Sequence, residues 1–254
     1  MPAVSLQKLV QPEYAKILCY PKPTKAEVNR RLKELKRLNV ETVSFRGPKQ
    51  LLNTHVLGKG CVGIVVLAQT KGKNAALKIR RVDADRPTMH NEANMLNKAN
   101  AVHVGPKLLG VSKNFLLTQC IKGQTLQEWL SQDRTRTEEH NVLTQILEQC
   151  WRLDQTGLDH GELSYAAKHV LITKSKKPVI VDFETASTNR SSSNVTSICQ
   201  YIFLSHTQGK PLVSERQRKA IIETLKRYKR NRSRENFERV LRVCELYHVG
   251  NRSF

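Results

Sequence analysis

Four short segments of this sequence contain residue types that could together carry out chemistry on a bound phosphate. They are the loop GKGCVGIV from Gly58 to Val65, ALKI around Lys78, HGEL at residues 160–163, and VDFE ending at Glu184. Each segment alone is a weak signal. Their order and spacing, however, match the parts that hold ATP, a metal ion and an attacking hydroxyl in phosphoryl transfer. The sequence therefore predicts an enzyme of that class.

The loop contains three glycines, Gly58, Gly60 and Gly63, between two strand-like runs. Glycine lets backbone N–H groups approach phosphate oxygens without obstruction by side chains. In a dinucleotide-binding βαβ unit the same spacing would open a helix, but here the β-branched run GIVVLAQT follows and ends in a turn. No Gly-Lys-Ser or Gly-Lys-Thr completes a Walker loop. A plain glycine-rich hairpin is the alternative.

Lys78 lies in an apolar strand, where an ammonium group is costly unless an anion pairs with it. Met89, Glu92 and Leu96 fall on one face of a predicted helix, so we expect Glu92 to point inward with its apolar neighbours. It would then pair with Lys78 and leave the lysine to bind nucleotide phosphates. The alternative is a lysine that extends to solvent and a surface glutamate.

Two further carboxylates follow strand-like or polar segments. Asp182 comes after PVIV, so it should end a buried strand, where it could hold Mg²⁺. Glu162 lies with His160 in a polar segment before Leu163, and its carboxylate could orient or deprotonate a hydroxyl nucleophile. An aspartate that caps a loop is the alternative for Asp182.

With these residues in place, the chain resembles the protein kinase-like superfamily. Its HGEL loop and compact size are most similar to the atypical, RIO-like archaeal serine/threonine protein kinases, and the similarity runs from about His55 to His206. It implies ATP and Mg²⁺ as cofactors and transfer of the γ-phosphoryl group to a serine or threonine hydroxyl of a protein. It also implies that Thr118 is the gatekeeper and that the backbone from Gln119 to Ile121 binds adenine. The nucleotide-binding residues would be Gly58, Gly60, Gly63, Val65, Lys78, Glu92, Gln119 and Ile121.

The chain departs from the family pattern at three positions. Glu162 stands where the family has an aspartate as catalytic base, and its extra methylene shifts the carboxylate by more than about 1 Å unless the loop compensates. His169 falls in the place of a metal-binding asparagine, with Lys168 beside it to offset charge on the γ-phosphate. His169 could equally be an ordinary core histidine. Glu184 replaces the family's final glycine. The resemblance thus implies Glu162, Lys78, Asp182 and Lys168 as catalytic residues, and Asp182 and His169 as metal ligands.

The loop after VDFE is short, from Thr185 to Ser193, and no Ala-Pro-Glu segment follows. We therefore expect no regulation by a phosphorylated activation loop and a reduced platform for peptide substrates. A small-molecule phosphotransferase of the same fold is one alternative. Another is a nucleotide-binding pseudokinase associated with RNA or ribosomes, which Glu162, His169 and the charged ends of the chain suggest.

The elements that must position these residues can be read from periodicity. Thr24 and Glu27 form a capping-box pattern before an amphipathic helix over residues 25–38. The charged residues of this helix are expected on a solvated face, with nucleic-acid contact as the alternative; they are Arg30, Arg31, Lys33, Lys36 and Arg37. Strands are predicted within 54–81, and a helix from about Pro87 to Asn100.

PKLLGV and NFLLTQCI should complete a small, mostly antiparallel sheet. From Thr125 the pattern is mainly helical, with KHVLI and PVIVDF as a buried strand pair and NVTSICQYIFLSH as a buried helix. Further helices are expected at 215–229 and 235–247. The predicted fold is α+β and bilobal, a small antiparallel β lobe and a mainly helical large lobe. Its parts are an N-terminal extension with the amphipathic helix (1–50), the small lobe (51–123), the large lobe (124–208) and basic helices packed on the large lobe (209–254).

Positive charge is concentrated at the two ends of the chain. The 43 Lys and Arg against 22 Asp and Glu give a formal charge of +21. Residues 1–50 hold 11 basic and 4 acidic side chains, and residues 209–254 hold 13 and 5. The run KRYKRNRSR at 226–234 could bind a phosphate backbone without sequence preference, with a solvated helix surface as the alternative. Its one aromatic residue, Tyr228, offers little basis for base stacking.

The six cysteines form neither a CxxC pair nor a zinc-binding spacing with histidine. The sequence shows no secretory signal and no apolar run near the roughly 20 residues that span a bilayer. We therefore expect reduced thiols, a cytoplasmic location and no membrane partner.

Overall fold

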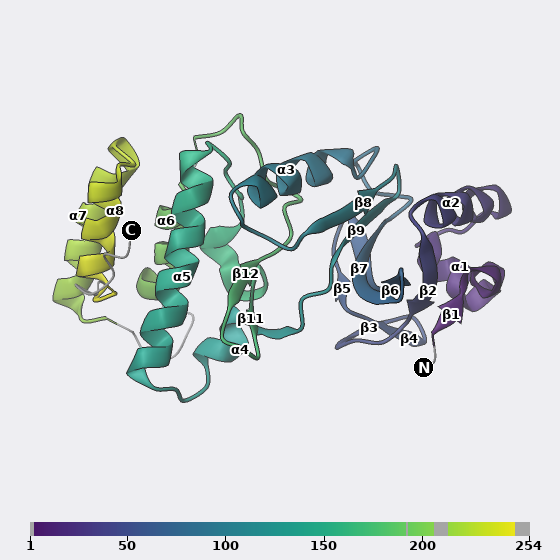
Figure 1. Cartoon of the computed structure of the whole chain (residues 1–254), viewed down its shortest axis with the longest axis horizontal. Coiled ribbons are helices and arrows are strands. Elements are labelled where there is room, and N and C mark those ends of the chain that lie inside the picture. The colour runs from purple at the N-terminus through teal and green to yellow at the C-terminus, as the bar shows by residue number, and fades with distance from the viewer. Residues whose placement is uncertain (1–2, 192, 206–212, 247–254) are drawn as a thin grey trace. The chain divides into compact units, whose positions relative to one another are not determined.

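The computed structural model describes residues 3–191, 193–205 and 213–246 (Figure 1). The chain divides into two compact units. Unit 1 consists of Met1–Asn97 and Pro106–Cys120, and unit 2 of Lys98–Gly105 and Ile121–Phe254. Both units contain helices and antiparallel strands, so the prediction of an α+β fold is confirmed at that level.

Unit 1 is built on one antiparallel sheet with the strand order β1-β2-β6-β7-β9-β8, and β5 pairs with β6 outside this path. β3 and β4 form a separate hairpin. The small antiparallel sheet was predicted correctly, but the first fifty residues also contribute two strands to it. The strands are β1 (Val4–Ser5), β2 (Val40–Ser44), β3 (Lys49–Leu51), β4 (Thr54–Val56), β5 (Gly58–Lys59), β6 (Gly63–Thr70), β7 (Lys73–Arg80), β8 (Leu108–Val111) and β9 (Phe115–Gln119).

Alternation of side chains places the core of unit 1 on one face of the central strands. Ile64, Val66 and Ala68 of β6 are buried, as are alternate residues of β7. β-Branched residues fit this pleated, half-buried surface. The helical segments η1 (Leu6–Val10), α1 (Pro12–Leu18) and α2 (Lys25–Arg37) add their apolar residues to the same core.

Helix α2 begins as predicted, because the Thr24 hydroxyl accepts a hydrogen bond of 3.2 Å from the Glu27 backbone N–H. The prediction that Arg31 lies on a solvated face is wrong. Its side chain is fully buried. Its guanidinium donates to the carbonyl oxygens of Leu18 (2.7 Å) and Arg80 (2.6 Å). A guanidinium has five donors and can satisfy several carbonyl groups at once, which compensates the burial of its charge.

Helix α3 (His90–Ala101) starts three residues later than predicted and runs from unit 1 into unit 2. The Met89 backbone N–H donates to the Lys113 carbonyl at 3.0 Å. This contact with the β8–β9 turn ties residue 89 to the sheet before the helix begins. Met89 itself is buried against Ala93 and Leu116.

Unit 2 combines helices with a three-stranded antiparallel sheet of order β10-β11-β12. The strand pair predicted from KHVLI and PVIVDF is confirmed as β11 and β12. Residues 194–204 of NVTSICQYIFLSH form a buried helical segment as expected, with His206 outside the described residues. The elements are β10 (Gly123–Thr125), α4 (Leu126–Leu130), α5 (Arg136–Gln155), η2 (Leu163–Lys168), β11 (Val170–Thr173), β12 (Pro178–Ile180), α6 (Asn194–Cys199), the π-helical turn η3 (Gln200–Leu204), α7 (Glu215–Arg230) and α8 (Arg234–Val243).

A buried carboxylate joins three helices of unit 2. Asp154 on α5 accepts hydrogen bonds from the backbone N–H groups of Asn194 (2.8 Å) and Val195 (3.2 Å) at the start of α6. It also accepts one of 2.8 Å from the hydroxyl of Tyr228 on α7. Burial raises the pKa of Asp154, and these hydrogen bonds oppose the shift. Because Tyr228 is fully buried here, it is unavailable as a stacking surface in the basic run.

Helix α8 ends at Val243, and the end predicted at Tyr247 lies outside the described residues. None of the six cysteines, which all lie in the described ranges, forms a disulfide, as expected. Over the described ranges, no helix has both the length and the apolar character needed to cross a bilayer.

Candidate functional site

The glycine-containing loop of unit 1 is a tight hairpin between β5 and β6. The Gly60 N–H donates to the Gly63 carbonyl at 2.8 Å, and Gly58 is paired with Val65 across the two strands. The strands predicted on both sides of the glycines are therefore confirmed, and no helix follows the loop. This hairpin can present backbone groups of residues 60–63 at its tip.

Gly63 is required by the side chain beside it. A Cβ at this position would lie 3.0 Å from Cγ of Lys78 and 3.1 Å from the carbonyl oxygen of Ile79. Contacts this short are rarely observed, so a larger residue would displace the lysine. The glycine therefore leaves space for the stem of Lys78, whose backbone pairs with Val65 in the sheet.

Lys78 and Glu92 form the predicted ion pair, with 2.9 Å between Nζ and Oε1. Their side chains are only 11% and 7% exposed. A charge pair in such a position is weakly screened, and each partner compensates the burial of the other. Glu92 lies in the first turn of α3, where the helix dipole also favours a negative charge. The ammonium group is thus held at a defined position on β7.

The predicted adenine-binding segment lies where the chain passes from one unit to the other. Gln119 is the last residue of β9, and its N–H donates to the Lys107 carbonyl at 2.9 Å. Thr118 is paired with Ala76 of β7. Ile121 is the first residue of the second segment of unit 2.

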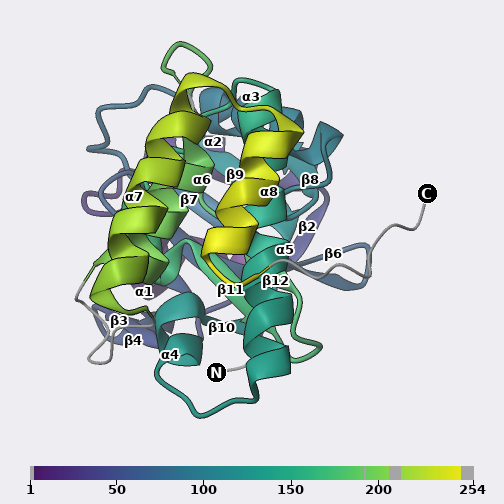
Figure 2. The ribbon, with the colours of Figure 1, turned by 90° about the vertical axis from the view of Figure 1, so that its left-hand side faces the viewer.

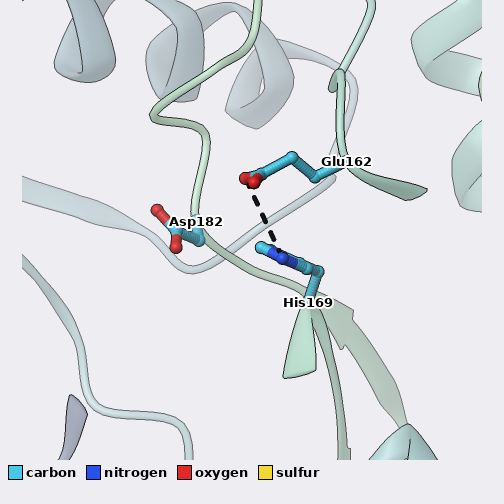
Figure 3. Close-up of side chains that lie close together, drawn as sticks. All are labelled: Glu162, His169 and Asp182. Atoms are coloured by element: carbon cyan, nitrogen blue, oxygen red, sulfur yellow. Dashed lines mark ion pairs between the residues drawn. The ribbon is translucent and has the colours of Figure 1, made fainter. Parts of the chain in front are cut away.

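Unit 2 brings the predicted base, Glu162, together with the two predicted metal ligands, His169 and Asp182 (Figure 3). Their ligand atoms all lie within 4.8 Å of one another. Nε2 of His169 lies 3.8 Å from Oε2 of Glu162. His169 is almost completely buried, whereas the Glu162 side chain is 35% exposed.

The strand pair β11–β12 explains why these side chains meet. Val170 is paired with Ile180, so the residues just beyond this pair emerge at the same end of the sheet. The Val181 N–H donates to the His169 carbonyl at 2.9 Å and extends the pairing. Asp182 follows in the left-handed region, with φ of 69°. Aspartate tolerates this backbone region better than most residues, and it leaves the sheet abruptly there.

The donor set suits a divalent cation. Two carboxylates offer the oxygen ligands that Mg²⁺ and Mn²⁺ prefer, while the imidazole of His169 favours Mn²⁺ and other transition metals over Mg²⁺. Lys168 lies next to His169 at the end of η2 with an exposed side chain, and Glu184 is half-buried. The structure therefore groups the two predicted metal ligands with the predicted base.

The HGEL loop is fixed by the segment after VDFE. Gly161 has φ of +89°, and a Cβ there would lie 2.6 Å from Arg190 Nη2. The Thr185 hydroxyl donates to the His160 carbonyl at 3.0 Å, and Arg190 donates to the Thr185 carbonyl at 2.6 Å. Arg190 also pairs with Asp159 at 2.8 Å. Thr185 and Arg190 were not predicted as site residues, and the glycine in HGEL was the one signal of so close a contact.

His160 supports this loop from inside the protein. Its Nε2 lies 3.1 Å from the Val181 carbonyl, and its backbone N–H donates to Oδ1 of Asn194 at 2.9 Å. Burial lowers the pKa of His160 to about 4. The ring is therefore neutral near pH 7, and it packs edge-on against Phe183. His160 holds the loop in place while Glu162 reaches the surface.

No family model matches this chain, and a comparison with curated proteins finds no match. The resemblance inferred from the motifs therefore stays a prediction.

Proposed function

We propose that this protein is an ATP-dependent serine/threonine protein kinase with a bilobal, protein kinase-like fold. The observation that carries the proposal is the Lys78–Glu92 ion pair, in which a largely buried strand lysine is held by a helix glutamate next to a glycine hairpin. A buried ion pair adds little to stability, because removing two charges from water costs about as much free energy as their attraction returns. Binding of a polyanionic ligand by the ammonium group of Lys78 would explain why the pair is present.

Unit 1 would bind the nucleotide. Backbone groups at the tip of the β5–β6 hairpin would contact the phosphates, and Lys78 would supply a positive charge to them. Glu92 would keep the ammonium group oriented when no nucleotide is bound. Val65 would contribute to the adenine pocket, and the backbone between Gln119 and Ile121 would bind the edge of the base.

Unit 2 would supply the groups that act on the acceptor. Asp182 and His169 would hold a divalent cation, which when bound would neutralise phosphate charge. Glu162 would accept a hydrogen bond from the serine or threonine hydroxyl and take its proton. Lys168 would offset negative charge on the transferred group. Since positioning and electrostatics provide most of the catalysis in this chemistry, a glutamate in the place of the base is compatible with turnover.

One observation favours a small-molecule acceptor as the second candidate. The segment after VDFE is tied back through Arg190 to Asp159 and to the Thr185 carbonyl. A segment held in this way offers little free backbone to an extended peptide. The second candidate keeps the nucleotide chemistry and changes only the acceptor.

The test is transfer of label from γ-labelled ATP, with Mg²⁺ or Mn²⁺ and a cell extract as the source of acceptors. The parent protein should label protein, and Lys78→Met should lose about 100-fold or more of this activity. Lys73→Met is the matched control, because Lys73 lies on the same strand with an exposed side chain. It should retain full transfer.

Two further measurements make this test decisive. Asp182→Asn should also abolish transfer while the circular dichroism spectrum stays that of the parent, which guards against a Lys78 variant that merely unfolds. Label that appears only in small molecules would favour the second candidate. Absence of cation-dependent transfer by the parent, or full activity of both variants, would refute both candidates.

A further inference from the structure

We propose that helix α7 binds the phosphate backbone of a nucleic acid through its outward face. The inference is independent of phosphoryl transfer. It starts from the two faces of α7, which lies beside α8 in unit 2 (Figure 2). Ile221, Leu225 and Tyr228 are buried and attach the helix to its own unit.

The opposite face of α7 carries a row of cations. Five lysine and arginine side chains make up this row. At about 100° per residue along a helix, they fall within an arc of roughly 100° that is centred opposite the buried residues. We call this row the α7 stripe. The row runs along nearly the whole helix, from its second residue to its last, over about 21 Å. Its members are Arg216, Lys219, Lys226, Arg227 and Arg230.

Most of the charge on the α7 stripe is not compensated by neighbouring carboxylates. Lys226 pairs with Glu223 at 2.8 Å. Within residues 3–191, 193–205 and 213–246, no ion pair joins a carboxylate to any of the other four cations. The neighbouring helix α8 differs, because its arginines are paired with glutamates. Those pairs are Arg234 with Glu148 and Glu238, Arg239 with Glu235, and Arg242 with Glu238.

A row of uncompensated cations on a rigid helix attracts polyanions. Residues three and four apart on a helix are about 5–6 Å apart at Cβ, so flexible side chains along the stripe can reach successive phosphates. The row contains no exposed aromatic residue for base stacking, which predicts binding without sequence preference. Insertion into a membrane surface is not favoured, because the apolar face of α7 is already buried in the protein.

The test is the fluorescence anisotropy of a labelled single-stranded RNA of mixed sequence, titrated with the full chain over a series of salt concentrations. Four uncompensated cations predict a slope of log K against log salt of about −3. The same experiment with duplex DNA of mixed sequence should also show salt-dependent binding. Phosphate contacts alone would account for both.

The decisive comparison uses two triple variants that change the net charge equally. Lys219→Glu, Arg227→Glu and Arg230→Glu together should weaken RNA binding by at least about 100-fold, and the slope should become less steep by about 2. The control carries Lys25→Glu, Lys33→Glu and Lys36→Glu, all at exposed positions of α2. It should bind RNA within a few-fold of the parent.

Three results would overturn the proposal. The first is no salt-dependent RNA binding by the parent. The second is equal weakening by the two triple variants, which would mean that net charge and not α7 governs binding. The third is tight binding to vesicles containing anionic lipid when RNA does not bind. Phosphoryl transfer by these variants can be measured separately, so failure here leaves the enzymatic proposal untouched.

Discussion

Replacement of Arg31 by methionine should destabilise unit 1 strongly, although its charge predicted a position on the surface. Methionine keeps the length and much of the volume of the side chain and removes its donors. The carbonyl oxygens of Leu18 and Arg80 would lose their bonds from Arg31, and Oδ1 of Asn114 would lose a bond of 3.2 Å. Glu27 would lose one of its two arginine partners, Arg31 at 2.8 Å, and keep the other, Arg30.

The size of the effect follows from these losses. A buried acceptor left without a donor costs about 1–3 kcal/mol. Removing one partner of a buried charge pair costs about 3–5 kcal/mol in total. Glu27 is partly exposed and keeps Arg30, and Asn114 keeps a bond from Arg80, so we expect a loss of about 3–4 kcal/mol, mainly from the two carbonyl oxygens. That is a large fraction of the stability of an ordinary domain.

The assay is urea unfolding followed by far-UV circular dichroism. Tryptophan fluorescence is unsuitable, because both tryptophans, Trp129 and Trp151, lie in unit 2. Lys33→Met on the same helix is the control, and it should change stability by no more than about 0.5 kcal/mol because Lys33 is exposed. If Arg31→Met cost less than about 1 kcal/mol, or no more than the control, the inferred role of the buried guanidinium would be wrong.

Three further predictions concern unit 2. The folded-state pKa of His160, about 4, lies below its ordinary 6.5, so its contribution of roughly 3 kcal/mol is present above pH 6.5 and is lost as the pH falls towards 4. Urea unfolding across this range should show that the free energy of unfolding falls more steeply with decreasing pH in the parent than in His160→Gln. Parallel pH profiles of the two proteins would contradict this role of His160. Gly161→Ala should cost about 2 kcal/mol or more of stability, from backbone strain and from overlap of the new methyl group with its neighbours. The control Gly157→Ala, at φ of +69° in open space, should cost about 1 kcal/mol. Equal losses in thermal unfolding would show that the overlap at Gly161 is relieved. Tyr228→Phe removes a hydroxyl bond to a buried carboxylate and should cost about 1–3 kcal/mol in the same assay, while Tyr165→Phe, 79% exposed, should be neutral; no difference between the two would exclude a stabilising bond.

Local signals predicted much of the secondary structure. The β-branched run GIVVLAQT is β6 over the residues expected, and the capping threonine marks the start of α2. The Lys78–Glu92 pair was also predictable, because an unpaired charge in an apolar strand needs an anion and helical spacing points one glutamate inward. These features depend on residues near in sequence or on a single strong physical requirement.

Features that depend on tertiary contacts were missed. Arg31 shares a helix face with the buried Val28 and Leu35, but its charge suggested exposure, and its acceptors come from distant segments. The late start of α3 reflects a backbone bond to Lys113 that periodicity does not reveal.

The candidate site of unit 2 shows the same limit. Asp182 and His169 were expected as ligands of one metal ion, but Glu162 was expected only as the base, and the sequence did not predict its ligand atom in the same group. The grouping depends on the β11–β12 register and on a loop held by side chains far along the chain.

The position of β9 between β7 and β8 has a consequence for how the chain is made. As the nascent polypeptide emerges, β6 and β7 can pair at once. The other edge of β7 stays unpaired until β9, which ends at residue 119, has left the ribosome. Exposed strand edges invite pairing with other chains. Any fragment of unit 1 must therefore extend through Gln119, and shorter pieces should self-associate rather than fold.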